Sequence, residues 1–425
     1  MWDRLLRNAR VVDPVNGRDG VMDVAVKDGR IAAVGPNLQG EASEVEDLTG
    51  LVVMPGLINL HTHAAMNLLR GRGADLPLMD WLTKEIWPAE GRLMSAEFVH
   101  DGSLIAGVEM IRSGVTCCSD LYFFPEAAAE GLREAGLRCA TAGIVIGFPS
   151  AWAANDDEYI SKCEALIERY SGDPFVRVTV GPHAPYTVSD ASLARCAALS
   201  ERHDLPVHIH VNETAGEVET SLKDHGERPV ARLARLGLLN ERLISVHSVH
   251  TSNEDIRMLA EARASVCPCP SSNLKLASGF APVAKMMKAG INLGIGTDGA
   301  ASNDKLDMLG ETRLAAMLAK AVAGATTCAK VFDMLEAATL GGARALHWDD
   351  EIGSLEIGKC ADMIAVDLSG IECGPVTDPA AQLLYSAGRE HVTHVWVAGR
   401  LAAGEGTEPR DDTARTLLEK WAPLI

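Results

Sequence analysis

Apolar and polar residues alternate along both ends of the chain, with the period of two that is typical of β-strands. In the stretch DVAVKDGRIAAVG, two alternating runs flank Asp28 and Gly29, a pair that favours a two-residue hairpin turn. Near the other end, CADMIAVDL and HVTHVWVAGRLAAG are also strand-like. Neither end is long enough to bury a core alone. We therefore expect residues 1–55 and residues 351–425 to build one small β-sandwich together, the second part also carrying a C-terminal helix.

Between these ends, short apolar runs alternate with stretches of helical period. There are eight such runs, of which LVVMPGLINL at 51–60 is the first and INLGIGTD at 291–298 is the last. We interpret the run 51–60 as one strand that is buried on both faces. Helical patterns such as SAEFVHDGSLIAGVEMIRSG and ASLARCAALSERHD separate them. Eight strand–helix units are typical of a (β/α)8 barrel, which we expect over residues 56–350. The predicted fold class is therefore α/β: a (β/α)8 TIM barrel with a small β-sandwich domain built from both chain ends.

Residue types that bind metal ions stand where several of these runs end. Residues two apart on a strand point the same way, so a His-x-His pair at a strand end aims both rings at one point. Barrel enzymes place their chemistry at the carboxyl ends of the strands. Five of the eight runs end in such residues, too many for core packing to explain: His61 and His63, then His183, then His208, His210 and Glu213, then His247 and His250, and finally Asp298.

These residue types suit metal-assisted hydrolysis. Imidazoles and a carboxylate can hold one divalent ion and leave a position open for water, whose pKa zinc lowers to about 7. Glu213, on the loop leaving its strand, can move protons without being a ligand. Asp298 can both bind metal and accept a proton, and His247 can hydrogen-bond to the developing oxyanion. His208 lies one layer deeper, where packing and metal ligation are equally plausible.

Composition narrows the class of protein. The chain has 425 residues, a net charge of −19 and ten cysteines without a disulfide-like spacing. The negative charge disfavours a nucleic-acid partner. No apolar run is long enough to span a membrane, and the first residues lack the apolar core of a signal peptide, so we expect a cytoplasmic protein without a membrane partner.

Several motifs carry a resemblance to a known family. PGLINLHTH, HIHVNETA, GTDGAASN and GSLEIGKCADMIAVD resemble the amidohydrolase superfamily over essentially the whole chain. Within it, DLPLMDWLTKEIWPAEGRL, DLYFFPE, GPHAPYTVSD, SSNLKLASGFAPV and GTDGAASNDKLDMLGE resemble the 5′-methylthioadenosine/S-adenosylhomocysteine deaminases. The chain departs from that pattern at two places: relatives often carry histidine at the position of Asn212 and near Pro268.

The resemblance implies the ligands and the substrate contacts. It implies one divalent ion, with zinc expected and iron or manganese as alternatives, bound by His61, His63, His210 and Asp298, and a fourth strand without a bridging lysine agrees. For the substrate it implies contacts from Glu90 and His183 to the ribose or nearby groups, although Glu90 reads as solvent-exposed. Further candidates for substrate contact are Trp87 and Ser302.

The expected activity is hydrolytic deamination of an adenine nucleoside. The candidates are 5′-methylthioadenosine, S-adenosylhomocysteine and adenosine, each giving its inosine analogue and ammonia, with Glu213, Asp298 and His247 as catalytic residues. Two alternatives stay open: a hydrolase of another N-heterocycle, such as a guanine-like, pterin or chlorotriazine ring, and a catalytically inactive barrel that acts as a binding protein. We expect a small-molecule nucleoside as partner and a homo-oligomer.

Overall fold

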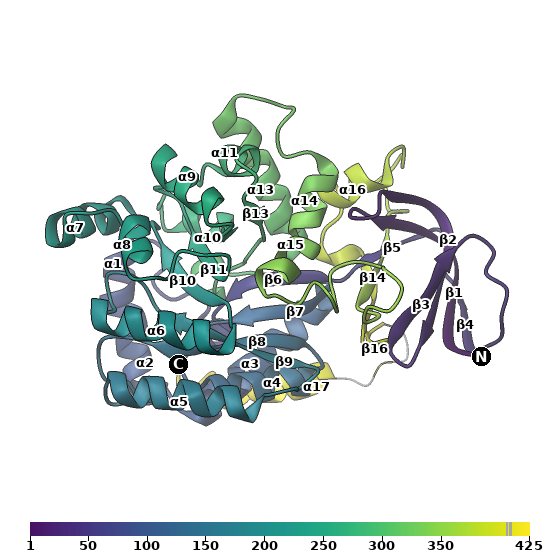
Figure 1. The fold of residues 1–425 in the computed structure, drawn as a ribbon. Helices are drawn as coiled ribbons and strands as arrows, with labels where there is room; N and C mark the ends of the chain where they lie inside the picture. Colours follow the sequence, from purple (N-terminus) through teal and green to yellow (C-terminus); the bar gives the residue numbers. More distant parts are fainter. Residues whose placement is uncertain (405–406, 408–409) are drawn as a thin grey trace.

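The computed structural model describes residues 1–404, 407 and 410–425, and within them two sheets organise the molecule. One is a parallel sheet of eight strands whose order in space follows their order in sequence (Figure 1). Its strands are β6 (Leu57–Thr62), β7 (Val115–Asp120), β8 (Arg138–Val145), β9 (Val176–Pro182), β10 (Val207–Val211), β11 (Leu243–His247), β12 (Ser265–Cys267) and β13 (Asn292–Leu293).

Hydrogen bonds at the two edges close this sheet into a barrel. The Leu60 N–H of β6 donates to the Ile295 carbonyl at 2.9 Å, and the Asp298 N–H donates to the His61 carbonyl at 3.0 Å. The segment that follows β13 therefore pairs with the first strand. All side chains of β6, β7, β8, β10, β11 and β12 are buried, as expected for strands covered on both faces. The predicted α/β barrel is confirmed.

Helices cover the outside of the barrel and connect its strands. The helical patterns noted in the sequence correspond to α3 (Ala96–Arg112) and α6 (Asp190–His203). Ser95 and Ser189 cap them, each accepting a hydrogen bond from the backbone N–H three residues on. The other helices up to the end of the barrel are α1 (Leu78–Trp81), η2 (Leu82–Ile86), α2 (Trp87–Leu93), α4 (Pro125–Ala135), α5 (Asp156–Arg169), α7 (Ala215–His225), α8 (Pro229–Arg235), α9 (Asn253–Glu261), α10 (Pro270–Lys275), α11 (Val283–Lys288), α12 (Ala300–Asn303), α13 (Met308–Ala323), α14 (Val331–Ala337) and α15 (Leu340–Ala345), with the short η1 (Ala64–Leu69) directly after β6.

Both ends of the chain contribute to the second sheet, at the right of Figure 1. Asp28 and Gly29, with φ angles of +51° and +74°, form the predicted hairpin turn. Leu6 and Val24 of the N-terminal part share one buried core with Met363 and Trp396 of the C-terminal part. The strands are β1 (Trp2–Asp13), β2 (Arg18–Lys27), β3 (Arg30–Gly35), β4 (Ala42–Asp47), β5 (Leu51–Pro55), β14 (Met363–Asp367), β15 (Val392–Val397) and β16 (Arg400–Ala403).

The apolar run 51–60 is divided between the two sheets, so its interpretation as one strand is wrong. β5 pairs with β1 and β14, whereas β6 begins the barrel. The division falls at Gly56, where an added Cβ would lie only 2.1 Å from the Thr116 hydroxyl oxygen. A continuous apolar pattern does not reveal such a break, because both halves are equally buried.

A buried ion pair joins the barrel to the terminal sheet. Arg138 of β8 donates to the Asp362 carboxylate at 2.6 Å, and both side chains are almost fully buried. Asp362 also accepts from the Ala398 N–H, so the pair reaches the turn between β15 and β16. On the barrel side, the Arg138 guanidinium lies 4.6 Å from the centre of the Phe175 ring. The C-terminal helix α17 (Arg410–Trp421) also packs against the barrel, where Trp421 contacts α3.

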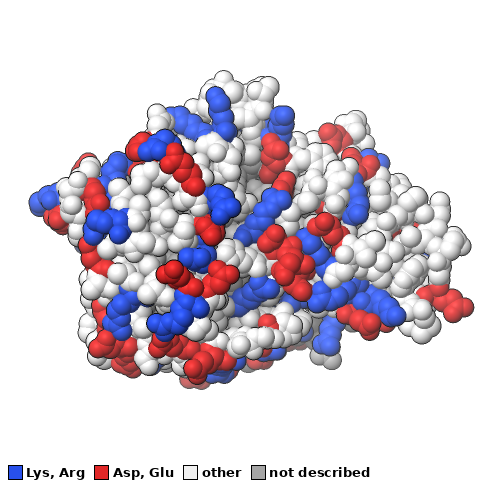
Figure 2. Space-filling model, viewed as in Figure 1, with Lys and Arg blue, Asp and Glu red and all other residues white. Residues whose placement is uncertain are grey.

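The surface is mixed in charge. On the face shown in Figure 2, acidic and basic side chains are interspersed. Ion pairs join neighbouring surface segments, such as Arg133 of α4 with Asp173 after α5, and Arg202 of α6 with Glu164 of α5. Among the described residues, no helix combines the length and the apolar character that crossing a membrane requires.

Arg138→Ala should lower the free energy of unfolding by about 3–5 kcal/mol, because it leaves the Asp362 carboxylate buried without its charge partner. Urea unfolding followed by circular dichroism measures this. Arg133→Ala is the matched control: its pair with Asp173 is solvent-exposed on the arginine side, and its loss should cost no more than about 1 kcal/mol. Equal effects of the two variants would contradict a special role for the buried pair.

Candidate metal centre and active site

The carboxyl ends of β6 and β10 and the loop after β13 bring four potential ligands together. One carboxylate oxygen of Asp298, Oδ1, lies 3.3 Å from Nε2 of His61 and 3.3 Å from Nε2 of His63. Nε2 of His210 lies 3.3 Å from Nε2 of His61. The strand period places His61 and His63 on one side, and the barrel brings the other two residues to the same point.

Hydrogen bonds at the outer ring nitrogens turn these imidazoles toward the centre. Nδ1 of His63 donates to the Leu121 carbonyl at 2.5 Å, and Nδ1 of His210 donates to the His183 carbonyl at 2.7 Å. Nδ1 of His61 lies 2.8 Å from Nε2 of His208. Nε2 of His61 and Nε2 of His63 therefore face the Asp298 carboxylate, and Nε2 of His210 faces Nε2 of His61. Metal-bound histidines are commonly held by such outer hydrogen bonds. This donor set fits a divalent ion.

Burial favours the neutral imidazoles that metal binding needs. It lowers the pKa of His61 to about 4, and it holds the pKa of His210 well below the usual range. Burial alone would raise the pKa of Asp298, but its histidine neighbours, the hydrogen bond from His61 first among them, bring it well below its usual range. The centre thus combines neutral nitrogen ligands with an ionised carboxylate.

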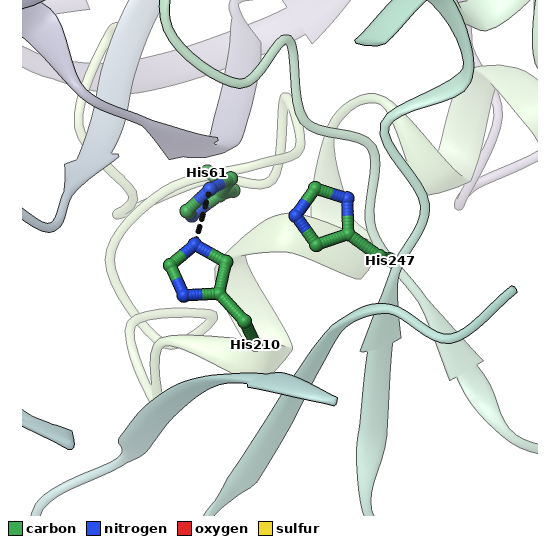
Figure 3. Close-up of side chains that lie close together, drawn as sticks. All are labelled: His61, His210 and His247. Atoms are coloured by element: carbon green, nitrogen blue, oxygen red, sulfur yellow. Dashed lines mark hydrogen bonds between the residues drawn. The ribbon is translucent and has the colours of Figure 1, made fainter. Parts of the chain in front are cut away.

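His247 completes a second group of possible ligands with His61 and His210 (Figure 3). Its other neighbours differ from those of the first three histidines. The amide nitrogen of Asn273 lies 3.0 Å from Nδ1, and the Glu213 carboxylate lies 3.8 Å from Nε2. Burial lowers the pKa of His247, but Glu213, Cys269 and Asp298 together outweigh it and raise the pKa to about 10. A ring that carries a proton on Nε2 is a hydrogen-bond donor toward the centre.

Glu213 is buried and held by a residue that sequence reasoning missed. Burial raises the pKa of its carboxyl group. The Glu217 carboxylate accepts from the backbone N–H groups of Asn212 and Glu213, at 2.9 and 2.8 Å, and so fixes the start of the loop. Thr214 accepts from the Glu217 N–H at the beginning of α7. The T-x-x-E spacing of a capping box was the available signal.

Two further residues support the centre from behind. His208 contacts His61 and the Ser119 hydroxyl, so it lies in the barrel interior behind the ligand cluster rather than within it. Asp120, at the end of β7, accepts from the Ala64 N–H and thereby holds the backbone that follows His63. Sequence reasoning missed Asp120, although its position at a strand end was a usable signal.

The Asp298 carboxylate is held by hydroxyls on its second oxygen. Ser272 and Ser302 donate to Oδ2 at 2.7 and 2.9 Å, and the Gly299 N–H donates to Oδ1 at 2.8 Å. Ser302, expected to contact substrate, also lines the cavity in front of the centre. Its hydroxyl is engaged with Asp298.

The remaining substrate-contact candidates line the same cavity. Glu90 is only partly exposed: it accepts from the Tyr122 hydroxyl at 2.6 Å, and burial raises its pKa to about 7. The expectation that it lies in open solvent is therefore wrong. His183 lies beside His210 and contacts the Thr187 hydroxyl. Trp87 stands at the mouth, 36% exposed.

A larger cavity exists elsewhere, between η1, α3 and α17. Its charged residues neutralise one another: Glu109 binds Arg70 and Arg389, and Asp411 binds Arg112. Neither of the candidate ligand groups reaches it. Chemistry therefore points to the smaller cavity at the strand ends.

Comparison with known proteins places the chain in a family. The model of the amidohydrolase family matches residues 52–402. The chain belongs to the amidohydrolase family. A relative from Teredinibacter turnerae, named 5-methylthioadenosine/S-adenosylhomocysteine deaminase, is 47% identical over 352 residues, which cover 83% of this chain and 80% of the relative. The resemblance found in the motifs is confirmed.

Two solved structures of the same fold contain zinc. An adenosine deaminase from Xanthomonas campestris with bound zinc is 43% identical, with a TM-score of 0.96 over 99% of both chains. An atrazine chlorohydrolase from Arthrobacter aurescens, complexed with zinc, shares the fold at 23% identity, with a TM-score of 0.90 over 98% of this chain and 100% of that one. Together with the ligand geometry, these findings support a divalent metal site.

The purified protein should carry close to one divalent ion per chain, because the two candidate ligand groups share His61 and surround one point. Elemental analysis by mass spectrometry measures the content. Asp298→Asn should reduce both metal retention and turnover, whereas Asp304→Asn, at a carboxylate paired with Lys275, should affect neither. Two tightly bound ions per active chain, or full activity after complete metal removal, would contradict this assignment.

Proposed function

We propose that this protein is a hydrolytic deaminase of adenine nucleosides, acting on 5′-methylthioadenosine, S-adenosylhomocysteine or adenosine. The observation that carries the proposal is the position of Glu213. Its buried carboxyl group lies beside the His/Asp cluster and 3.8 Å from His247, yet it belongs to neither group of possible ligands. The names of the Teredinibacter and Xanthomonas relatives support the same reaction class.

The metal would be held by His61, His63, His210 and Asp298, and we propose zinc because the two solved relatives contain it. A divalent ion there supplies hydroxide at neutral pH by lowering the pKa of water. The charges of the ligands agree with this role: neutral imidazoles and one carboxylate leave a divalent ion with a net positive charge, which lowers the pKa of water.

Different side chains of the protein carry out the separate proton transfers of the reaction. Water adds to C6 of the adenine ring, and Asp298 accepts one of its protons. Glu213 delivers a proton to ring nitrogen N1, so that C6 becomes tetrahedral without a charge building on the ring. His247 donates a hydrogen bond to the oxygen added at C6. Asp298 then returns its proton to the amino group, which leaves as ammonia, while the proton of the C6 hydroxyl passes to Glu213. The ring becomes the inosine analogue, and both side chains regain their starting forms.

The other site residues act on the rest of the nucleoside. Glu90 and His183 line the cavity and would bind the ribose hydroxyls, and Trp87 would cover the outer part of the substrate. We also propose that residues 56–350 carry the chemistry, with residues 1–55 and 351–425 as the supporting β-domain. A homo-oligomer and a cytoplasmic location stay predictions.

Glu213→Gln should keep the metal and the fold but lower kcat by roughly 10²–10⁴-fold, because the amide cannot deliver the proton to N1. Steady-state kinetics, with metal content as a second readout, measures this. Glu219→Gln is a matched control on the exposed face of α7 and should retain native rates. A Glu213→Gln enzyme with near-native turnover would exclude the proton-transfer role.

The enzyme should release ammonia from adenosine, 5′-methylthioadenosine or S-adenosylhomocysteine and leave guanine, pterin and chlorotriazine rings unchanged. A screen for released ammonia, and for released chloride with the chlorotriazine, tests the whole proposal, and the change in adenine-ring absorbance confirms it. Turnover of one of the other rings, with none of the adenine nucleosides, would move the protein to the alternative substrate class. If the metal-loaded protein turned over none of these compounds, this result would favour the alternative of a catalytically inactive barrel that acts as a binding protein.

A further inference from the structure

The cavity in front of the metal centre has two chemically different ends. At the strand ends its wall consists of histidines and carboxyl groups such as Glu213 and Asp298. The outer wall comes from α1, η2 and α2 on one side and from the chain after β8 on the other. Apart from Glu90 of α2, the side chains that these segments place in the wall are apolar, among them Leu78, Leu82, Ile86, Trp87, Ile146 and Phe148. Such a division lets one end hold the reacting ring while the other end selects the remainder of the substrate.

The reaction determines which part of a nucleoside meets the apolar end. If C6 and N1 of adenine face the metal centre and Glu213, the ribose extends away from it, and its 5′ substituent is the most remote part. Trp87 and Phe148 stand at the cavity mouth with ring centres 6.1 Å apart and with 36% and 39% of their surfaces exposed. Two half-exposed aromatic rings across the mouth offer an apolar surface that a ligand group can cover.

The charges around the mouth disfavour an anionic 5′ group. Among the described residues that line the cavity there is no Lys or Arg, and Glu90 places a carboxyl group in the same wall. The nearest candidates on flanking segments are engaged elsewhere. Lys84 pairs with Asp80 on the exposed side of the η2 segment, Arg72 pairs with Glu85, and Lys275 pairs with Asp304. A buried carboxylate or phosphate without a cation partner is costly.

We propose that Trp87 and Phe148 form the binding surface for the 5′ substituent, and that this enzyme selects adenine nucleosides with a small uncharged 5′ group. This inference rests on the proposed deaminase function and adds its specificity. 5′-Methylthioadenosine fits best, since its methylthio group is apolar and of a size that the two rings can cover. Adenosine follows, whereas the charged amino-acid end of S-adenosylhomocysteine and the phosphate of AMP meet no cation.

Comparison of kcat/KM values for 5′-methylthioadenosine, adenosine, S-adenosylhomocysteine and AMP tests the order. We expect 5′-methylthioadenosine to exceed S-adenosylhomocysteine by at least about tenfold, with AMP the poorest. S-adenosylhomocysteine or AMP at or above 5′-methylthioadenosine would overturn this inference and leave the deaminase proposal intact. No turnover of any of the four would overturn both.

Two substitutions test the location of the 5′ group. Phe148→Arg places a cation at the mouth, in a loop that tolerates a polar side chain because Phe148 is already partly exposed. It should raise the ratio of kcat/KM for S-adenosylhomocysteine to that for 5′-methylthioadenosine by about tenfold or more. Phe332→Arg, an equally exposed phenylalanine on α14, should leave the ratio unchanged. An unchanged ratio in a Phe148→Arg enzyme of native metal content would contradict the assigned location.

Lys84→Ala tests whether the Lys84 ammonium group binds the charged end of S-adenosylhomocysteine. Lys84 lies on the helical segment of the mouth, and its side chain is 62% exposed. If no cation serves the substrate, this variant keeps kcat/KM for S-adenosylhomocysteine within about twofold of the native value. A loss of tenfold or more, confined to S-adenosylhomocysteine, would show that Lys84 binds its carboxylate and would overturn the inference.

Discussion

Burial of the Asp298 carboxylate is the constraint on which the arrangement of the site depends. A carboxylate removed from water is costly unless neighbouring groups compensate its charge. In the part of the chain that the structure describes, its partners are imidazoles, two serine hydroxyls and a backbone N–H, with neither Lys nor Arg. Three of the surrounding histidines are held neutral by burial. A divalent ion would add positive charge beside this carboxylate, next to that of the His247 ring, whose pKa is raised to about 10.

This constraint extends outward through the groups that orient the imidazoles. The rings of His63 and His210 are aimed by backbone carbonyls, and the ring of His61 is aimed by His208, which is itself held by Ser119. These partners belong to β7, to β10 and to the segments that follow β7 and β9. The geometry of the centre thus depends on the closure of the whole barrel, and an error in one strand would move a ligand. Such outer hydrogen bonds are a general feature of metal sites in proteins.

Reactivity and selectivity come from different parts of the barrel. The residues to which we assign proton transfer stand at strand ends, where neighbouring strands and the buried core hold the backbone. The residues to which we assign selection stand on α1, η2, α2 and the loop after β8. This separation allows the substrate to change while the centre stays the same, because loop side chains can be replaced without disturbing the strands. The shared fold with an atrazine chlorohydrolase at 23% identity illustrates how widely such barrels vary.

The sequence by itself determined the strand–helix alternation, the closeness of His61 and His63, and the strand-end positions of His183, His210, His247 and Asp298. These follow from the period of two along a strand and from the parallel order of a barrel, both of which are visible within short windows. Only the tertiary structure decided that the run 51–60 is divided at Gly56 and that His208 lies behind His61. It also decided that Glu90 lines the cavity and accepts a hydrogen bond from Tyr122, and that Glu217 holds the backbone of Glu213. Each of these depends on side chains that meet from different segments, and a local pattern of polar and apolar residues contains no information about which distant segment becomes a neighbour.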